Sequence, residues 1–166
     1  MFPRRYELRQ QKEGSMMHIG FIVAVVLALL ITASAWAGDH ECQTVGGVLM
    51  TNLGAIAGVT NLGPVSGDLA GSVAATILGQ NSDGTFNVQH YWVTSAGETI
   101  LLKQAVLKPA ATSDPNVVAV LWGNYSSDIL GGTGKFKNAT GRIDYFGIAD
   151  FKELTLVLRY RGKVCH

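Results

Sequence analysis

The sequence predicts an all-β protein, an antiparallel closed barrel of about eight strands that follows an N-terminal signal helix. From Gly38 onward, no segment repeats its apolar residues with the period of a helix. Most apolar runs are short, rich in β-branched residues and bounded by Gly, Asn, Asp or Pro, and the chain contains 20 glycines. Short strands with short connections favour antiparallel pairing, because parallel strands need long crossovers.

Residues 1–37 have the pattern of a signal peptide that is removed. Four basic residues stand near the start: Arg4, Arg5, Arg9 and Lys12. An apolar run over residues 19–32 precedes Ala35-Trp36-Ala37, which has small residues where signal peptidase cleaves. The run is shorter than the ~20 residues of a membrane-spanning helix, and the alternative is an uncleaved signal anchor. Translation starts at Met1, Met16 or Met17, which the sequence does not distinguish.

Residues 38–166 are long enough for one domain with a hydrophobic core. The predicted leader holds four of the 13 Lys and Arg residues and two of the 12 Asp and Glu residues, so the remainder has a net charge of −1. Without a basic cluster, we expect no nucleic-acid partner. The remainder has no second long apolar run, so we expect no stable membrane insertion after cleavage and a secreted or periplasmic location.

Turn signals divide this domain into its expected strands. The strands occupy residues 44–59, 64–78, 86–93, 99–108, 117–125, 142–149 and 154–164. Turns are expected at residues 61–64, 81–84 and 95–97. Asp83-Gly84 is a strong hairpin signal, because it supplies the positive φ values of a tight turn. Residues 109–115 contain two prolines and small polar residues, so we expect a mobile loop there.

Alternation along the last strand assigns its two faces. One face carries Thr155, Val157, Arg159, Arg161 and Lys163, and the other carries Leu154, Leu156, Leu158 and Tyr160. Burying three unpaired cations would be prohibitive, so the leucine face points to the core. Residues 117–121 are apolar on both faces, which favours a second subunit that covers the outer side.

The two cysteines, Cys42 and Cys165, lie near opposite ends of the expected domain. In an exported protein this arrangement favours one structural disulfide that makes the first and last strands neighbours. Two free thiols or a redox pair are the alternatives, although no Cys-x-x-Cys spacing supports redox chemistry.

A glycine-rich stretch lies late in the chain, Gly131-Gly132-Thr133-Gly134-Lys135-Phe136-Lys137-Asn138-Ala139-Thr140-Gly141. A Walker loop needs glycine at position 129 and Ser or Thr at 136, where this chain has Ile129 and Phe136. A dinucleotide fingerprint needs a glycine at position 137. We therefore interpret the stretch as a structural turn. Its glycines set the backbone, Phe136 packs into the core, and Lys135 is an exposed strand residue.

The stretch resembles the glycine-rich strand connection of the allene oxide cyclase and dirigent barrels, including small secreted bacterial proteins of that superfamily. Residues 94–100 resemble a hairpin of these bacterial proteins, and residues 154–158 lie where their last strand does. The likeness covers roughly residues 85–165. It implies a barrel with an apolar interior that is commonly a dimer or trimer. The plant members cyclise an unstable epoxide or orient radical coupling, and none of their catalytic residues can be placed on this chain.

His90 is the histidine that falls within an expected strand, on the face of Phe86, Val88 and Trp92. It is either a hydrogen-bonded core residue or a functional group. The candidates for lining a ligand cavity are His90, Trp92, Trp122, Asn124 and Tyr125. Asp128 and Asp144 flank the glycine stretch, either as carboxylates at the barrel mouth or as solvated strand residues. No Ser/His/Asp set or Cys–His metal spacing occurs, so we expect neither a metal nor a cofactor.

Two classes of function remain open. In the first, the barrel binds a small hydrophobic ligand in or at the mouth of its interior, without catalysis or with the steering of a cofactor-independent cyclase or isomerase. In the second, it is a non-catalytic exported domain that acts through its surface. We favour the binding protein. Asn124 and Asn138 begin glycosylation sequons, which matter only in a eukaryotic secretory pathway.

Export gives the first testable prediction. N-terminal sequencing of the secreted protein should begin at Gly38, because Ala35-Trp36-Ala37 meets the requirement of signal peptidase. Recovery of the uncleaved chain from membranes would show a signal anchor instead.

Overall fold

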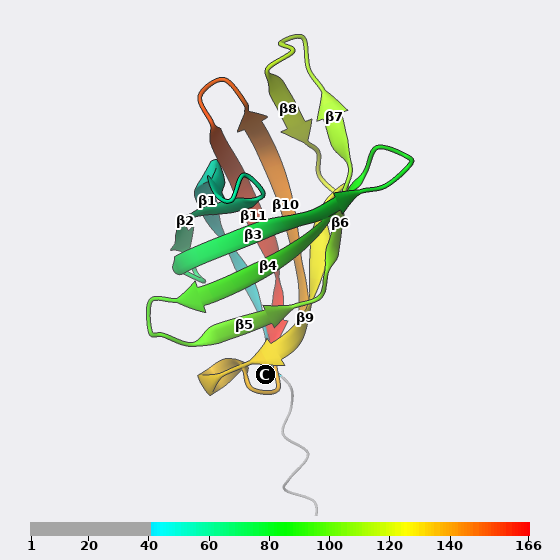
Figure 1. The fold of residues 1–166 in the computed structure, drawn as a ribbon. Coiled ribbons are helices and arrows are strands. Elements are labelled where there is room, and N and C mark those ends of the chain that lie inside the picture. Colours follow the sequence, from blue (N-terminus) through cyan, green and yellow to red (C-terminus); the bar gives the residue numbers. More distant parts are fainter. Residues whose placement is uncertain (1–40) are drawn as a thin grey trace, which may run out of the picture. The chain divides into compact units, whose positions relative to one another are not determined.

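The structure, a computed structural model, describes residues 41–166 (Figure 1). The expected signal peptide and the three candidate start methionines lie outside the described residues. Within residues 41–166, no helix is both long enough and apolar enough to cross a membrane.

The described residues form eleven strands and one short 3-10 helix. In chain order they are β1 (Cys42–Ile56), β2 (Thr60–Gly67), β3 (Gly71–Gln80), β4 (Phe86–Thr94), β5 (Thr99–Leu102), β6 (Ala105–Leu107), β7 (Pro109–Ala111), β8 (Val117–Val120), β9 (Ser126–Gly132), η1 (Gly134–Phe136), β10 (Thr140–Asp150) and β11 (Thr155–Cys165).

These strands close into an antiparallel barrel. The order of neighbours is β11-β1-β2-β3-β4-β5-β9-β10, and pairing of β10 with β11 completes the circle. The other three strands are short additions. β6 follows β5 and pairs with the first residues of β4. β8 pairs with the last residues of β10, and β7 pairs with β8. The predicted eight-stranded closed barrel is therefore confirmed.

Two predicted hairpins are confirmed, and local hydrogen bonds explain both. In the 81–84 turn, the Asp83 carboxylate accepts hydrogen bonds from the Thr85 amide (3.1 Å) and hydroxyl (2.7 Å). Gly84 there has a φ of 82°. In the 95–97 turn, the Thr94 amide donates to the Glu98 carbonyl oxygen at 2.8 Å.

The turn predicted at residues 61–64 is wrong, because these residues lie within β2. The Asn61 side chain accepts a hydrogen bond from the Gly54 amide (2.9 Å), where the register of β1 and β2 shifts. The asparagine therefore supports an irregularity in the neighbouring strand. The turns that flank β2 lie at residues 57–59 and 68–70.

The loop predicted at residues 109–115 is partly wrong, because Pro109–Ala111 forms β7. β7 lies at the edge of the sheet and Pro109 is its first residue, a position where proline's missing N–H is tolerated. The strand predicted over residues 117–125 is also interrupted. It breaks after Val120 at a turn in which Gly123 has a φ of 81°.

The face assignment along β11 is confirmed except at its start. Leu158 and Tyr160 are buried, whereas Arg159 and Arg161 are exposed. Leu154 is exposed, with a φ of 51°, so its predicted place in the core is wrong. The Asp150 carboxylate accepts hydrogen bonds from two turn amides, and Leu154 ends this turn before the strand begins.

Large side chains fill the half of the barrel next to η1 and the C-terminus. The buried side chains there include Trp92, Ile100, Leu102, Phe136, Ile143, Tyr160 and Val164. Trp92 and Tyr160 meet edge to face, with 5.2 Å between ring centroids. The indole of Trp92 donates to the Leu69 carbonyl oxygen, and the Leu69 amide donates to the Tyr160 hydroxyl, both at 2.9 Å. These bonds fix the β2–β3 turn against this end of the core.

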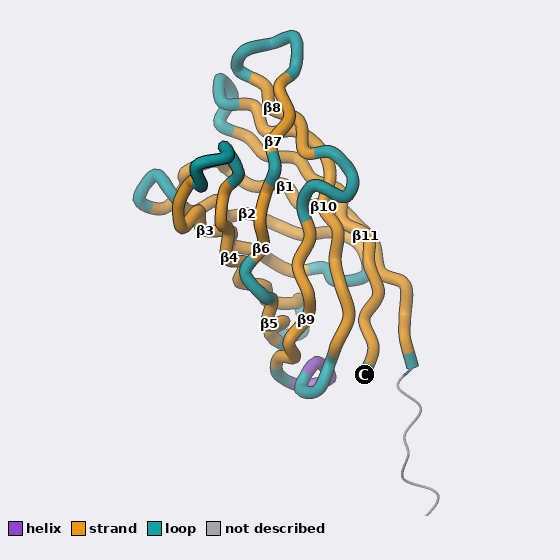
Figure 2. The backbone as a smooth tube through the Cα atoms, turned by 90° about the vertical axis from the view of Figure 1, so that its right-hand side faces the viewer, coloured by secondary structure: helices purple, strands orange, loops and turns teal. Residues whose placement is uncertain are grey.

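The glycine-rich stretch wraps around Phe136 at this end, where η1 forms the helical turn in purple in Figure 2. Gly134 has a φ of 57°, and a Cβ there would meet the Glu98 side chain at 2.3 Å. Gly132 is constrained differently, since its φ is not in the left-handed region. A Cβ on Gly132 would instead lie 2.0 Å from the Thr99 carbonyl oxygen. Lys135 is exposed as expected but lies in η1, so the strand prediction for it is wrong.

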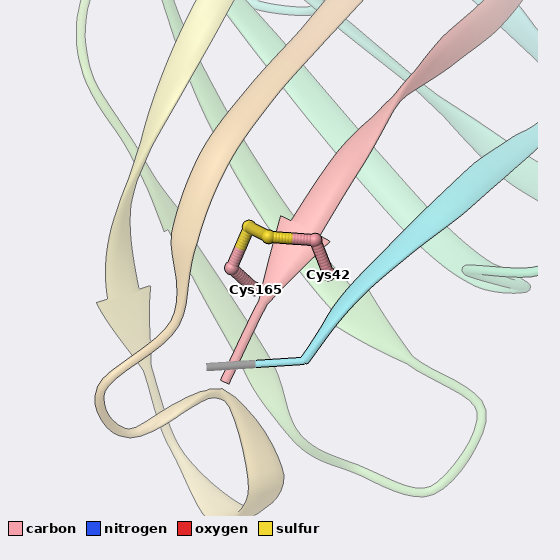
Figure 3. Close-up of a disulfide and its surroundings, with 2 residues drawn as sticks. All are labelled: Cys42 and Cys165. Carbon is pink, nitrogen blue, oxygen red and sulfur yellow. A yellow bond between two sulfur atoms is a disulfide. The ribbon is translucent and has the colours of Figure 1, made fainter. Parts of the chain in front are cut away.

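A disulfide joins Cys42 of β1 to Cys165 of β11, as predicted (Figure 3). The two residues are direct partners in the antiparallel register of these strands. The bond closes a loop with a sequence separation of 123 residues. On the chain-entropy model such a loop contributes roughly 4 to 5 kcal/mol to stability. A structural disulfide indicates an oxidising, exported environment.

Two neighbouring substitutions test the packing of the glycine-rich stretch. Phe136→Ala should lower the free energy of unfolding by about 3 to 5 kcal/mol, because it empties a fully buried site. Lys135→Ala should change it by no more than about 0.5 kcal/mol, because the side chain is exposed and its ion pair with Glu98 is weak. Urea titrations of both variants measure these changes. Equal losses would contradict the packing described.

Candidate functional site

The other half of the barrel interior holds a cavity of about 270 Å³. Its rim is made of half-buried or exposed side chains: Leu53, Ile77, Phe86, Leu107, Pro109 and Phe151. Pro109 begins β7 and Phe151 lies in the β10–β11 turn. Figure 1 shows the β7–β8 hairpin and the β10–β11 turn at the end of the barrel opposite η1. The cavity therefore opens at that end and reaches inward to a buried floor.

The cavity wall is apolar. Its buried aliphatic side chains include Leu49, Val73, Ala75, Val88, Val120 and Leu158. They lie on inner faces of β1, β3, β4, β8 and β11, because alternate residues of a strand point to the same side. No acidic or basic side chain of the described residues lines the cavity, apart from the imidazole of His90.

The cavity floor is a cluster of polar aromatic side chains. The Nε2 atom of His90, in β4, lies 2.7 Å from the hydroxyl oxygen of Tyr125. Its Nδ1 lies 3.3 Å from the hydroxyl of Ser127 in β9. The ring of Tyr145, from β10, stacks on His90 with 4.9 Å between centroids. These side chains come from β4, β9, β10 and the connection before β9, and they meet at one point of the interior.

A break between two strands positions Tyr125. β8 ends at Val120 and β9 begins at Ser126, and both pair with β10. Between them, the Tyr145 amide donates a hydrogen bond to the Tyr125 carbonyl oxygen at 2.9 Å. This bond continues the pairing across the break and holds the two tyrosines next to each other, with 5.0 Å between ring centroids.

Burial keeps the floor uncharged near neutral pH. It lowers the pKa of His90 to about 4, because the charged imidazolium is poorly solvated there. Burial, and to a lesser extent Tyr145, raises the pKa of Tyr125 well above its usual value. Burial also raises the pKa of Tyr145, and an interaction with Ser127 offsets this only in part. The floor thus offers neutral hydrogen-bonding groups.

Neutral His90 donates from one ring nitrogen and accepts at the other. If Nδ1 donates to Ser127, Nε2 accepts from Tyr125; if Nε2 donates to Tyr125, Nδ1 accepts from Ser127. Both tautomers satisfy the two contacts. In the second tautomer, the proton of the Tyr125 hydroxyl is free for another acceptor.

Two further hydroxyls at the cavity lack a partner. Among the described residues, neither Tyr145 Oη nor Thr51 Oγ1 has a partner at hydrogen-bonding distance and angle. Tyr145 is fully buried and Thr51 is 4% exposed, and both residues line the cavity. Buried polar groups are nearly always paired, so both hydroxyls require an explanation.

The structure brings together two of the five residues expected to bind a ligand, His90 and Tyr125. Trp92 lies in the filled half of the barrel and does not line the cavity. Trp122 is 56% exposed and packs against Phe146 outside the cavity, with 5.0 Å between ring centroids. The carbonyl oxygen of Asn124 accepts a hydrogen bond from the Lys108 amide at 3.0 Å.

Sequence reasoning missed Tyr145, Thr51 and Ser127. Alternation along residues 142–149 places Tyr145 on the same face as Ile143, and that signal was available. Asp128 and Asp144 do not line the cavity. Instead they flank Arg142, whose guanidinium lies 3.1 Å from Asp128 and 3.7 Å from Asp144. No cluster of three potential metal ligands occurs among residues 41–166.

Two buried tyrosines provide a matched test of the unpaired hydroxyl. Tyr145→Phe should leave the free energy of unfolding unchanged or raise it by up to about 1 kcal/mol, because it removes an unpaired buried hydroxyl. Tyr160→Phe should lower it by about 1 to 3 kcal/mol, because the Leu69 amide loses its acceptor. Thermal and urea unfolding measure both. A large loss in Tyr145→Phe would show that its hydroxyl is paired within the protein.

Comparison with known proteins gives little beyond this description. No protein-family model matches the chain, and no curated protein matches it. Among solved structures, a pterocarpan synthase dirigent protein matches with a TM-score of 0.34 and 14% sequence identity. The match covers 80% of this chain and 94% of that protein. The relationship to dirigent barrels stays a prediction.

Proposed function

We propose that this protein is an exported barrel that binds a small, mainly apolar molecule in its interior. The observation that supports this proposal is the cavity of about 270 Å³ between an open rim and a polar floor. The interior of a small barrel is ordinarily filled by side chains. An empty apolar space loses dispersion contacts and destabilises a fold. A ligand that occupies the space would restore these contacts.

The size and lining of the cavity limit the ligand. A cavity of about 150 Å³ accommodates benzene. A volume of about 270 Å³ therefore suits a molecule of roughly ten to fifteen non-hydrogen atoms. The apolar wall favours a hydrocarbon or aromatic body, and the few polar groups at the floor favour one defined orientation.

The chemistry of the floor supports binding without catalysis. A histidine whose pKa is about 4 is a weak base at neutral pH, and no carboxylate lines the cavity to assist it. The tyrosine hydroxyls stay protonated, because burial raises the pKa of each. These groups can orient a ligand through hydrogen bonds.

Naphthalene is a suitable first probe because it is apolar, uncharged and of the expected size. Its dissociation constant should be on the order of tens of micromolar, because a ligand of this size gains about −0.6 kcal/mol of binding free energy per non-hydrogen atom. Affinity should be constant from about pH 5.5 to about pH 8.5, because no group at the floor changes charge in this range. Titration calorimetry and naphthalene fluorescence measure both quantities.

Two valines of β4 provide the variant and its control. Val88 lines the cavity, so Val88→Phe should weaken naphthalene binding at least about tenfold and should fold normally, since the larger side chain enters open space. Val93 points outward and is 44% exposed, so Val93→Phe should bind as the parent does. No binding to the parent protein, or equal binding by both variants, would refute an interior site.

A further inference from the structure

The unpaired hydroxyl of Tyr145 distinguishes it from the other buried tyrosines of the barrel. The Tyr160 hydroxyl accepts a hydrogen bond from the Leu69 amide, and the Tyr125 hydroxyl contacts His90. The Tyr145 ring stacks on His90, and Tyr145 is one of the residues that line the cavity. A phenylalanine would provide the same ring without an unpaired polar atom. Packing therefore explains the ring of Tyr145. The Ser127 hydroxyl interacts with the Tyr145 hydroxyl, but not within hydrogen-bonding distance and angle, so the Tyr145 hydroxyl still lacks a partner of normal geometry.

The charge of the lining also limits what can bind. No Lys or Arg among the described residues lines the cavity, so a carboxylate ligand would be buried without a cation. No Asp or Glu lines it either, so an ammonium group would be equally unpaired. Burying an unpaired charge in an apolar site is strongly unfavourable. The cavity thus rejects ions of both signs.

We infer that the cavity selects an uncharged apolar molecule that carries a hydroxyl or carbonyl oxygen, and that this oxygen binds the Tyr145 hydroxyl. This inference rests on the proposed function, because it assumes that the cavity takes a ligand. A tyrosine hydroxyl both donates and accepts, so it can pair with a carbonyl or with a hydroxyl. Thr51, the second unpaired hydroxyl, offers a further contact in the wall.

Three molecules with the same ring system test this selectivity: naphthalene, naphthol and naphthoate. At neutral pH, naphthol should bind about tenfold more tightly than naphthalene, because its oxygen pairs a buried hydroxyl that naphthalene leaves unpaired. Naphthoate is ionised at this pH and should bind at least about 100-fold more weakly than naphthol. Titration calorimetry on the purified protein measures all three affinities.

Matched tyrosine variants assign the contact. Tyr145→Phe should bind naphthalene as the parent does and should lose the preference for naphthol. Tyr160→Phe should keep the preference, because Tyr160 does not line the cavity. Retained naphthalene binding also shows that the Tyr145→Phe protein is folded. Thr51→Val is a second variant that removes a hydroxyl and keeps the side-chain shape, and it should reduce the preference less than Tyr145→Phe does.

The outcomes separate this inference from the proposed function. If the parent protein binds none of the three molecules, the interior site itself is wrong. If it binds naphthalene and naphthol equally, or binds naphthoate as tightly, the site stands and the selectivity is wrong. A naphthol preference that survives Tyr145→Phe and disappears in Thr51→Val would overturn the assignment to Tyr145.

Discussion

Pairing of β11 with both of its neighbours is the interaction on which the barrel depends. Residues 155–165 pair with β1 on one side and with β10 on the other, and the Cys42–Cys165 disulfide covalently joins one of these edges. Closure leaves no free edge between the first and last strands, and it gives every strand one face toward a common interior. Each inward side chain must then fill that interior or line a space within it.

The sizes of the inward side chains decide where the interior is filled. Near η1 they are large, as with Trp92, Phe136 and Tyr160, and they pack without reaching the cavity. Around the cavity the inward side chains include Ala75, Val88 and Val120, which are smaller. The same backbone scaffold therefore provides a packed base at one end and a cavity at the other. This division gives the floor residues a rigid support.

Local signals predicted most strands and hairpins, because turn chemistry and alternation act over a few residues. They failed where a contact with another strand determines the local structure. Asn61 was predicted in a turn, but it lies in a strand and its side chain accepts a hydrogen bond from the Gly54 amide. The site was harder to predict for the same reason. Alternation shows that His90 and Tyr145 both point inward, but only the strand register brings their rings to 4.9 Å. Trp122 fell outside the cavity because the chain turns at Gly123.

The two tyrosines of the β10–β11 pair show where stability and recognition separate. Tyr145 and Tyr160 are direct partners in the register, and both rings are buried. The Tyr160 hydroxyl serves the fold, because it binds the amide of a turn. The Tyr145 hydroxyl interacts with Ser127 but has no partner of hydrogen-bonding geometry among the described residues. Tyr145 lines a cavity whose walls carry no Asp, Glu, Lys or Arg. Under the binding function proposed above, the Tyr145 hydroxyl would weaken the barrel without a ligand and strengthen a complex with a neutral ligand, which is a role in recognition.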